Sequence, residues 1–503
     1  MKRLAGILLA SALLLAACGG TGGSYTLGGT VSGLRGTLVL ANDSDRVTIT
    51  QNGPFAFPQK QPNGARYRVT IETPPLFENC TVANGEGTVR GADVRDVAVT
   101  CEDKAWQGPE GLEPDLAGDA IRVRTAFAGE RQLVAWEEQQ KIYLTTGGEG
   151  GWSDPELVAQ NDADSLGLAG NPSGFAAMAW TAKKGGTQQV FAKTYAGGHW
   201  SGTRWLSDGR EAHLPSLAVN DAQGAVLTWQ ENDGQNTRIR VAFFDGGGWS
   251  TPAYVSEAGQ DAEHPAAAVN NHGDALVAWL QRGDVYAALY ENGQWRSPER
   301  LPGNSLSNEN VHVFLDDAGR GYAVWEVSNP GGSRLALAVY RVGAWARDDI
   351  GTSGARAPVI AGSRSEGTVT IAWLAAEGGA ARVWAKVFEN GKWLGPEVLS
   401  PPGGTGNNAE AVFVAADPAG NALAVWLQKD GSHRRQVFAA FRQYGLWRKP
   451  ADLDDFLSRP GYAVRPPVSR GGPSAALGQG RALAAWSQDD GGCCTRTFAS
   501  VYR

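Results

Sequence analysis

Short runs of alternating apolar and polar residues, separated by turn residues, fill most of the chain after residue 24. In residues 264–281, "HPAAAVNNHGDALVAWLQ", one apolar run is followed by Asn, His and Gly, and a second apolar run then contains Trp279. Alternation with a period of two predicts half-buried β-strands, and the polar, Gly-containing interruptions predict tight turns. The pattern therefore predicts an all-β protein.

The same segment recurs along the chain, with a tryptophan kept in its second apolar run. Similar stretches occur at residues 214–231 and 409–428. The spacing of this marker tryptophan is about 50 residues, which is the period of β-propeller blades. The markers are Trp136, Trp180, Trp229, Trp279, Trp325, Trp373, Trp426 and Trp486. We expect each of them to be an apolar plate between adjacent blades.

Each repeat is long enough for four strands. Around Trp279 these are "PAAAVNN", "ALVAWLQ", "VYAALYE" and "RSPERLP". Asn292 and Gly293 lie between the third and the fourth strand, and this dipeptide favours the type I′ turn of a β-hairpin.

The last repeat ends at "TFASVYR", without a fourth strand. The segment "KAWQGPEGL" at residues 104–112 matches "GKWLGPEVL" at residues 391–399, where a fourth strand is expected. We therefore predict an eight-bladed β-propeller over residues 104–503, in which the N-terminal strand completes the last blade. Closing the ring in this way removes free sheet edges.

The first residues resemble the sorting signal of bacterial lipoproteins. Residues 1–17 carry "MKR", an apolar run too short to span a bilayer comfortably, and small residues before Cys18. The resemblance implies that Cys18 is lipidated, and Gly19 after it favours the outer membrane. Residues 18–23 then form a flexible spacer. A plain secretory signal is the alternative, and with either signal the protein lies in or beyond the bacterial cell envelope.

Residues 24–103 contain several short alternating runs, such as "RVTITQNG" and "RYRVTIET". The segment resembles the Ig-like or transthyretin-like modules beside the anchor of bacterial surface lipoproteins, which implies a small β-sandwich that acts as a spacer. Cys80 and Cys101 are expected to form a disulfide in an oxidising envelope. A zinc site is the alternative, but no histidine or further cysteine stands nearby.

Cys493 and Cys494 are neighbours near the end of the chain. A disulfide between them would be strained, because adjacent Cα atoms are only about 3.8 Å apart and the usual disulfide span is longer. We expect such a vicinal disulfide in the envelope, with two free thiols or an intermolecular bridge as alternatives.

Composition and charge limit the partners. The formal net charge is −7, and an acidic balance argues against a nucleic-acid partner, which calls for a basic patch. No calcium loop or phosphate-binding glycine loop occurs, so no cofactor or metal is expected. The expected partners are the membrane, through the lipid anchor, and a polar ligand. We expect a monomer.

Candidate ligand residues are the polar ones that follow the marker strand or precede the next repeat. In a propeller these loops open on the face of the channel mouth, where such groups can build a pocket. The candidates are Glu138, His213, Glu231, His264, Gln281, Glu326, Glu410, Gln428 and Gln488. The alternative is that they only satisfy loop backbone between blades. On the opposite face, "NDAQG", "NNHG", "DDAG" and "DPAG" are explained by turn geometry alone.

The segment "NDAQGAVLTW" is similar to the Asp-box of sialidase-like propellers, although Asp221, Gly224 and Trp229 are more widely spaced than in that motif. No arginine cluster or activated tyrosine of the sialidase kind can be assigned. We expect a non-enzymatic binding or scaffolding platform for a glycan, peptide or protein. The alternatives are a sialidase-like or other carbohydrate-active hydrolase at the same channel mouth, and a scaffold for outer-membrane protein assembly.

Overall fold

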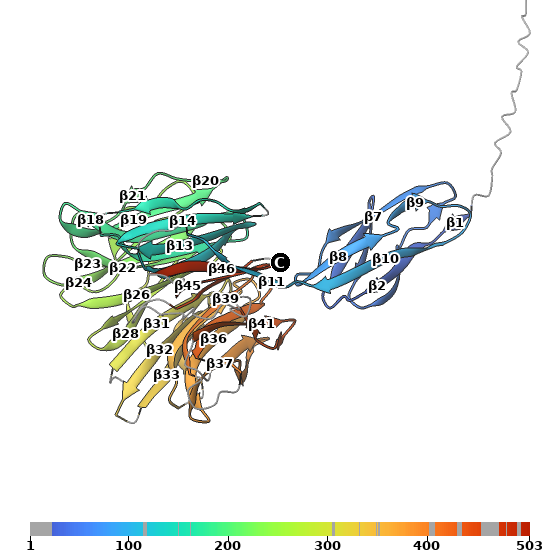
Figure 1. Cartoon of the computed structure of the whole chain (residues 1–503). Helices are drawn as coiled ribbons and strands as arrows, with labels where there is room; N and C mark the ends of the chain where they lie inside the picture. The colour runs from blue at the N-terminus through green and yellow to red at the C-terminus, as the bar shows by residue number, and fades with distance from the viewer. Residues whose placement is uncertain are drawn as a thin grey trace, which may run out of the picture. The chain divides into compact units, whose positions relative to one another are not determined.

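The computed structural model describes residues 23–113, 118–148, 150–160, 162–303, 307–330, 332–348, 350, 353–401, 408–429, 435–453, 472–478, 480–489 and 494–503. Within these residues the regular elements are all β-strands, and no helix suited to crossing a membrane is among them. The predicted all-β class is confirmed. The chain divides into two compact units, Met1–Lys104 and Ala105–Arg503 (Figure 1). Cys18 and Cys493 lie outside the described residues, and Cys494 is disulfide-bonded.

The first unit contains two four-stranded sheets, in the orders β5-β2-β10-β8 and β4-β3-β7-β9, and a two-stranded sheet of β1 and β6. Leu27 and Val97 from one sheet share a buried cluster with Leu40 from the other. Cys80 and Cys101 stand opposite each other on β8 and β10 and form the predicted disulfide. The strands are β1 (Ser24–Tyr25), β2 (Leu27–Ser32), β3 (Leu38–Asn42), β4 (Asp45–Ile49), β5 (Gly53–Ala56), β6 (Gln61–Pro62), β7 (Arg66–Thr73), β8 (Glu78–Ala83), β9 (Glu86–Thr88) and β10 (Val94–Asp103).

Eight antiparallel sheets form the described part of the second unit. Their first strands are β12 (Ala120–Ala128), β17 (Asp164–Gly170), β22 (Ala212–Val219), β26 (Ala262–Val269), β31 (Ser307–Leu315), β35 (Arg356–Gly362), β39 (Ala409–Ala416) and β44 (Ser474–Leu477). Their second strands are β13 (Arg131–Glu138), β18 (Ala176–Lys184), β23 (Ala225–Asn232), β27 (Ala275–Gln281), β32 (Gly321–Asn329), β36 (Val369–Glu377), β40 (Ala422–Lys429) and β45 (Ala482–Asp489).

The third strands are β14 (Lys141–Gly148), β19 (Thr187–Ala196), β24 (Thr237–Phe244), β28 (Asp284–Glu291), β33 (Gly332–Arg341), β37 (Ala380–Glu389), β41 (Arg435–Gln443) and β46 (Thr495–Tyr502). The outer strands are β15 (Gly151–Trp152), β16 (Glu156–Ala159), β20 (His199–Trp200), β21 (Arg204–Trp205), β25 (Ala253–Tyr254), β29 (Gln294–Trp295), β30 (Glu299–Arg300), β34 (Ala344–Asp348), β38 (Lys392–Val398), β42 (Leu446–Trp447), β43 (Ala451–Asp452) and, for the last sheet, β11 (Trp106–Gly111).

The first strands surround a common axis. Each of them contacts the first strand of the next sheet, and β44 of the last sheet contacts β12 of the first. The sheets therefore follow one another in a ring, which is the arrangement of a β-propeller.

The ring closes at the junction of the two ends of this unit. Trp106 on β11 stands opposite Tyr502 on β46, so the first strand of the unit pairs with the last (Figure 1). The Trp106 ring lies 5.6 Å from the ring of Phe441 in the preceding sheet and 5.6 Å from that of Tyr502. The predicted completion of the last sheet by residues 104–112 is confirmed by this pairing.

The marker tryptophans lie between neighbouring sheets, as predicted. Each of the eight has 2% or less of its surface exposed. Trp279 of the fourth sheet packs with Val226 and Ile239 of the third. Trp136 of the first sheet packs with Leu483 of the last, so the same contact spans the closing junction.

The turn at Asn292 and Gly293 has the predicted geometry. Their φ angles are 53° and 79°, both in the left-handed region that a type I′ turn requires. The fourth strand after it differs from the predicted residues 296–302, because it consists of two short pieces, β29 at Gln294–Trp295 and β30 at Glu299–Arg300. Pro298 lies between the two pieces, and proline has no N–H to donate to the ladder.

Glu113 ties the closing strand to the ring. Its side chain is fully buried, and its Oε1 accepts a 2.6 Å hydrogen bond from the backbone N–H of Thr497. Arg496 Nη1 lies 3.7 Å from its Oε2. Burial raises the pKa of Glu113 to about 7, with the nearby Glu138 adding to the effect.

The first prediction concerns closure. A protein that begins at Ala105 should melt at the same temperature as the propeller of the full chain, because it keeps the β11–β46 pairing. A protein that begins at Glu113 should melt several degrees lower, because it exposes the edge of β46 and removes the Trp106 ring from Phe441. Circular dichroism melting of both proteins measures the difference, and equal melting temperatures would rule out a stabilising role for the closing strand.

The second prediction concerns the pH dependence of stability. The pKa of Glu113 is higher in the folded protein than its ordinary 4.5, so its contribution to stability is complete below that pH and is lost as pH rises through about 7. Glu113→Gln removes this loss. The variant should match the wild type near pH 4.5 and be more stable at pH 8 by on the order of 3 kcal/mol. Denaturation curves across this range test it, with the exposed Glu110→Gln as control.

Candidate functional site

The polar residues two positions after the marker tryptophans hold the indole rings. Residues two apart on a strand lie on the same face, so the indole Nε1 can reach the next side chain on its own face. Four of the tryptophans donate in this way over 2.8 to 3.1 Å. The acceptors are Glu231, Gln281, Gln428 and Gln488. All four acceptor residues are buried.

Glu231 has the densest set of partners among the predicted site residues. Besides Trp229, its carboxylate accepts a 2.6 Å hydrogen bond from Arg240 Nη1 and lies 3.4 Å from the hydroxyl of Tyr254. The residue has no exposed surface, and burial raises its pKa. The carboxylate therefore fixes the interior of the sheet and does not face solvent.

Other predicted site residues also have partners within the ring. Glu138 is buried and its Oε1 accepts a hydrogen bond from Gly118 N, while its Oε2 has no hydrogen-bond partner among the described residues. The Oε2 of Glu326 accepts from Ala357 N of the next sheet at 2.9 Å. Glu410 pairs with Arg435 and Lys429 of its own sheet.

The two predicted histidines remain accessible. The side chain of His213 is 40% exposed and its Nε2 lies 3.1 Å from Glu211, whereas the side chain of His264 is 53% exposed. Every residue of the predicted channel-mouth set except these two has a buried or ion-paired role within the ring. That the set binds a ligand stays a prediction.

A repeated β-bulge explains why acids and amides follow the marker strand. Near its start, the first strand of several sheets has a non-glycine residue with positive φ, and its pairing register shifts there. A backbone N–H at each of three bulges donates to the preceding sheet. The acceptors are Glu137 for Leu166, Gln230 for His264 and Glu326 for Ala357. The sequence does not predict these bulges, because Leu214 and Ala357 are not residue types that favour positive φ.

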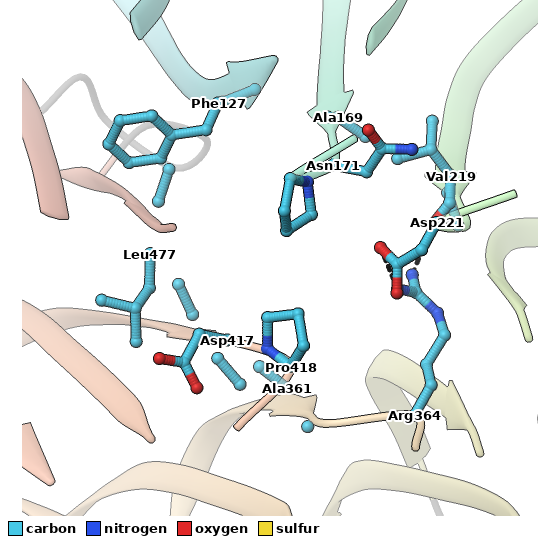
Figure 2. Close-up of a pocket in the computed structure, with 18 of the residues that line it drawn as sticks. Phe127, Ala169, Asn171, Val219, Asp221, Ala361, Arg364, Asp417, Pro418 and Leu477 are labelled. Atoms are coloured by element: carbon cyan, nitrogen blue, oxygen red, sulfur yellow. Dashed lines mark hydrogen bonds and ion pairs between the residues drawn. The ribbon is translucent and has the colours of Figure 1, made fainter. Parts of the chain in front are cut away.

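A cavity of about 300 Å³ lies on the ring axis, at the end where the first strands finish (Figure 2). All eight sheets contribute to its wall. Representative wall residues, one from each sheet, are Phe127, Asn171, Asp221, Val269, Phe314, Arg364, Asp417 and Leu477. Small residues such as Ala218, Ala267 and Gly362 leave the space open. A pocket of this size suits a small ligand or one unit of a polymer.

The turns at this end do more than reverse the chain, so the prediction that turn geometry alone explains their letters is wrong. Asn171 Nδ2 donates to the carbonyl of Asn220 at 2.6 Å, and Asn220 Nδ2 donates to that of Asn270 at 2.8 Å. The Oδ1 atoms meanwhile accept from the residues' own turns, at Phe175 N and Gly224 N. One side chain thus closes a turn and ties two sheets together.

Asp417 occupies the corresponding place in the seventh sheet, directly after its first strand. Its two carboxylate oxygens accept 2.9 Å hydrogen bonds from the backbone and side-chain nitrogens of Asn421. The residue is 2% exposed, and burial raises its pKa. It therefore keeps a proton more readily than an aspartate in water.

Arg364 crosses the ring from the sixth sheet to the third and fourth. Its Nε donates to the carbonyl of Val269 at 2.8 Å, and its Nη2 donates to that of Val219. Its Nη1 lies 3.9 Å from Oδ1 of Asp221. The side chains of Arg364 and Asp221 are 24% and 29% exposed, so both reach the cavity. Burial lowers the pKa of Arg364, but a guanidinium stays protonated in proteins.

The wall has two chemically different sides. Figure 2 shows Phe127 and Leu477 on one side and the Asp221–Arg364 pair on the other. Such a site can hold a ligand that has both an apolar surface and hydrogen-bonding groups. Within the described residues no group of three or more His, Cys, Asp and Glu side chains could hold a metal ion.

No family model and no curated protein matches the sequence. Among solved structures, an ulvan lyase is similar with a TM-score of 0.45 and 10% identity, over 68% of this chain and 98% of that one. An α-L-arabinofuranosidase from Fusarium graminearum has a TM-score of 0.36 and 13% identity, over 56% and 97%. A Hadza microbial sialidase has a TM-score of 0.35 and 12% identity, over 78% and 98%.

These similar structures are all enzymes that act on carbohydrates, so the prediction that the protein is not an enzyme is wrong on this comparison. The substrates of those proteins are not transferred to this chain, because similarity at this level gives no information about ligands.

The third prediction separates structural from ligand-binding roles in the channel-mouth set. Glu231→Ala leaves the buried Trp229 indole without its acceptor and removes one of the two carboxylates beside Arg240, the other being Asp208, so it should destabilise the fold by about 1–3 kcal/mol. His213→Ala removes a side chain with a single solvent-accessible ion pair and should change stability by less than about 0.5 kcal/mol. Thermal melting compares the two variants. A Glu231→Ala variant as stable as the wild type would show that the contacts of Glu231 do not stabilise its sheet.

Proposed function

We propose that the protein is a carbohydrate-active enzyme that binds a sugar residue in the axial cavity of an eight-bladed β-propeller. The observation that carries this proposal is the two-sided wall of the cavity. A sugar ring has hydroxyl groups around its edge and apolar C–H groups on its faces. Phe127 and Leu477 can pack against such a face while Asp221 and Arg364 bond to the edge.

The proposed reaction is hydrolysis of a glycosidic bond. Most glycosidases use two carboxyl groups, one as the acid and the other as base or nucleophile. Two aspartates line the cavity in different surroundings, since Asp221 faces a guanidinium while burial raises the pKa of Asp417. Two carboxyl groups in such different surroundings can divide the acid role and the base or nucleophile role between them. We assign the acid role to Asp417 and the base or nucleophile role to Asp221.

The proposed location is the bacterial outer membrane, with lipidated Cys18 as the anchor. The paired sheets of the first unit, with their shared core and disulfide, support a compact Ig-like sandwich at residues 24–103 that acts as a spacer. A monomer with a tethered propeller would reach glycans of the envelope or its surroundings. The vicinal disulfide between Cys493 and Cys494 stays a prediction.

The fourth prediction tests this function. Lipid-free protein of residues 24–503 should bind members of a glycan array and release reducing ends from at least one bound glycan. Asp221→Asn, which keeps the shape of the side chain, should lower turnover by roughly 100-fold or more, because it removes the proposed base or nucleophile. Asp417→Asn should lower it similarly.

Asp284→Asn is the matched control, because Asp284 pairs with Arg300 away from the cavity. It should leave turnover unchanged. Binding without turnover would refute the hydrolysis step, and turnover that persists in both cavity variants would place the reaction elsewhere. Absence of glycan binding altogether would refute the function.

A further inference from the structure

The Asp221–Arg364 pair is too widely spaced for a direct hydrogen bond. Oδ1 and Nη1 are 3.9 Å apart, whereas N–H···O bonds span about 2.7–3.2 Å. The carbonyls of Val219 and Val269 hold the guanidinium in this position. Asp221 is held as well, because its backbone N–H donates to Asn271 Oδ1 at 2.9 Å. The two charged groups therefore remain side by side at the cavity wall without a direct hydrogen bond between them.

A hydroxyl group matches this pair better than an ion does. A hydroxyl accepts one hydrogen bond and donates another, so a single hydroxyl can accept from Arg364 and donate to Asp221. A carboxylate only accepts and would place its charge beside that of Asp221. An ammonium only donates and would meet the charge of Arg364. Like charges at this separation repel, most strongly where water is excluded.

The rest of the wall offers no further cation to a ligand. Asp417 is the one other ionisable residue of the lining, and it is an acid, so Arg364 is the single cationic group there. The remaining lining residues are apolar or neutral, as Phe127, Leu477 and Asn171 are. An anionic ligand would find no cationic group in this wall that lacks an adjacent carboxylate.

We infer that the axial cavity selects a neutral sugar residue, one hydroxyl of which bridges Asp221 and Arg364, and discriminates against sugar acids. This inference rests on the proposed function and specifies its substrate class. The C–H face of the sugar packs against the Phe127 and Leu477 side of the cavity, opposite the bridging hydroxyl (Figure 2).

The fifth prediction is a specificity test by titration calorimetry on lipid-free protein. The probes are oligosaccharides of equal length in three pairs: galactose with galacturonic acid, glucose with glucuronic acid, and mannose with mannuronic acid. In the pair or pairs that bind, the neutral member should bind at least about 10-fold more tightly, as expected when a like charge opposes the acid.

Asp221→Asn should reverse the discrimination in part. The variant keeps an oxygen acceptor for the hydroxyl but loses the negative charge, so the neutral sugar should weaken a few-fold and the acid should gain affinity. The ratio between them should fall by about 10-fold. Asp284→Asn should leave the ratio as it is in the wild type.

The outcomes separate this inference from the function on which it depends. Tighter binding of the sugar acids by the wild type, or an unchanged ratio in Asp221→Asn, would overturn the selection of neutral sugars and leave a carbohydrate function standing. Failure of every probe and of the glycan array would overturn the proposed function itself.

Discussion

Ring closure is the constraint on which the rest of the second unit depends. In the first seven sheets the marker tryptophan packs in a buried cluster with residues of the sheet before it, so these sheets need a neighbour on that side. An open row of sheets would leave one such face and one strand edge exposed. Pairing of β11 with β46 avoids both, and it places Trp136 of the first sheet against Leu483 of the last. The small residues along the first strands then define the width of the axial space.

The two faces of the ring use their polar residues differently. On the face where first strands begin, acids and amides accept from indoles and from backbone N–H groups at bulges, so their hydrogen-bonding capacity is used within the fold. On the face where first strands end, asparagines tie adjacent turns together and surround a cavity. A ligand that binds between Asp221 and Arg364 breaks no hydrogen bond between these two side chains. To reach Glu231, it would have to displace Trp229 or Arg240.

Sequence alone gave the repeat, the buried tryptophans and the closing strand, because each depends on local signals that recur. These signals are visible in the sequence itself: the apolar alternation, the Asn292–Gly293 dipeptide, and the match of residues 104–112 to 391–399. The location of the cavity could not be predicted from such local signals. It depends on contacts between sheets far apart in the chain, such as that of the Arg364 side chain with the Val219 carbonyl. Predicted ligand residues such as Glu326 and Gln281 are instead used within the fold, because they accept hydrogen bonds from a bulge N–H and from an indole.

The cavity is asymmetric because one of the turns around it departs from the repeat. The position after the turn-closing residue is Asp221, Asn271 and Asp317 in three successive sheets, and each backbone N–H there donates to the next sheet. Arg364 stands at this position in the following sheet, and its side chain instead extends past the fifth sheet to the fourth and third. A ring of identical turns would present the same groups to a ligand from every side. One long cationic side chain, held beside an aspartate and facing an apolar wall, makes one edge of the cavity polar and so can orient an asymmetric ligand such as a sugar ring.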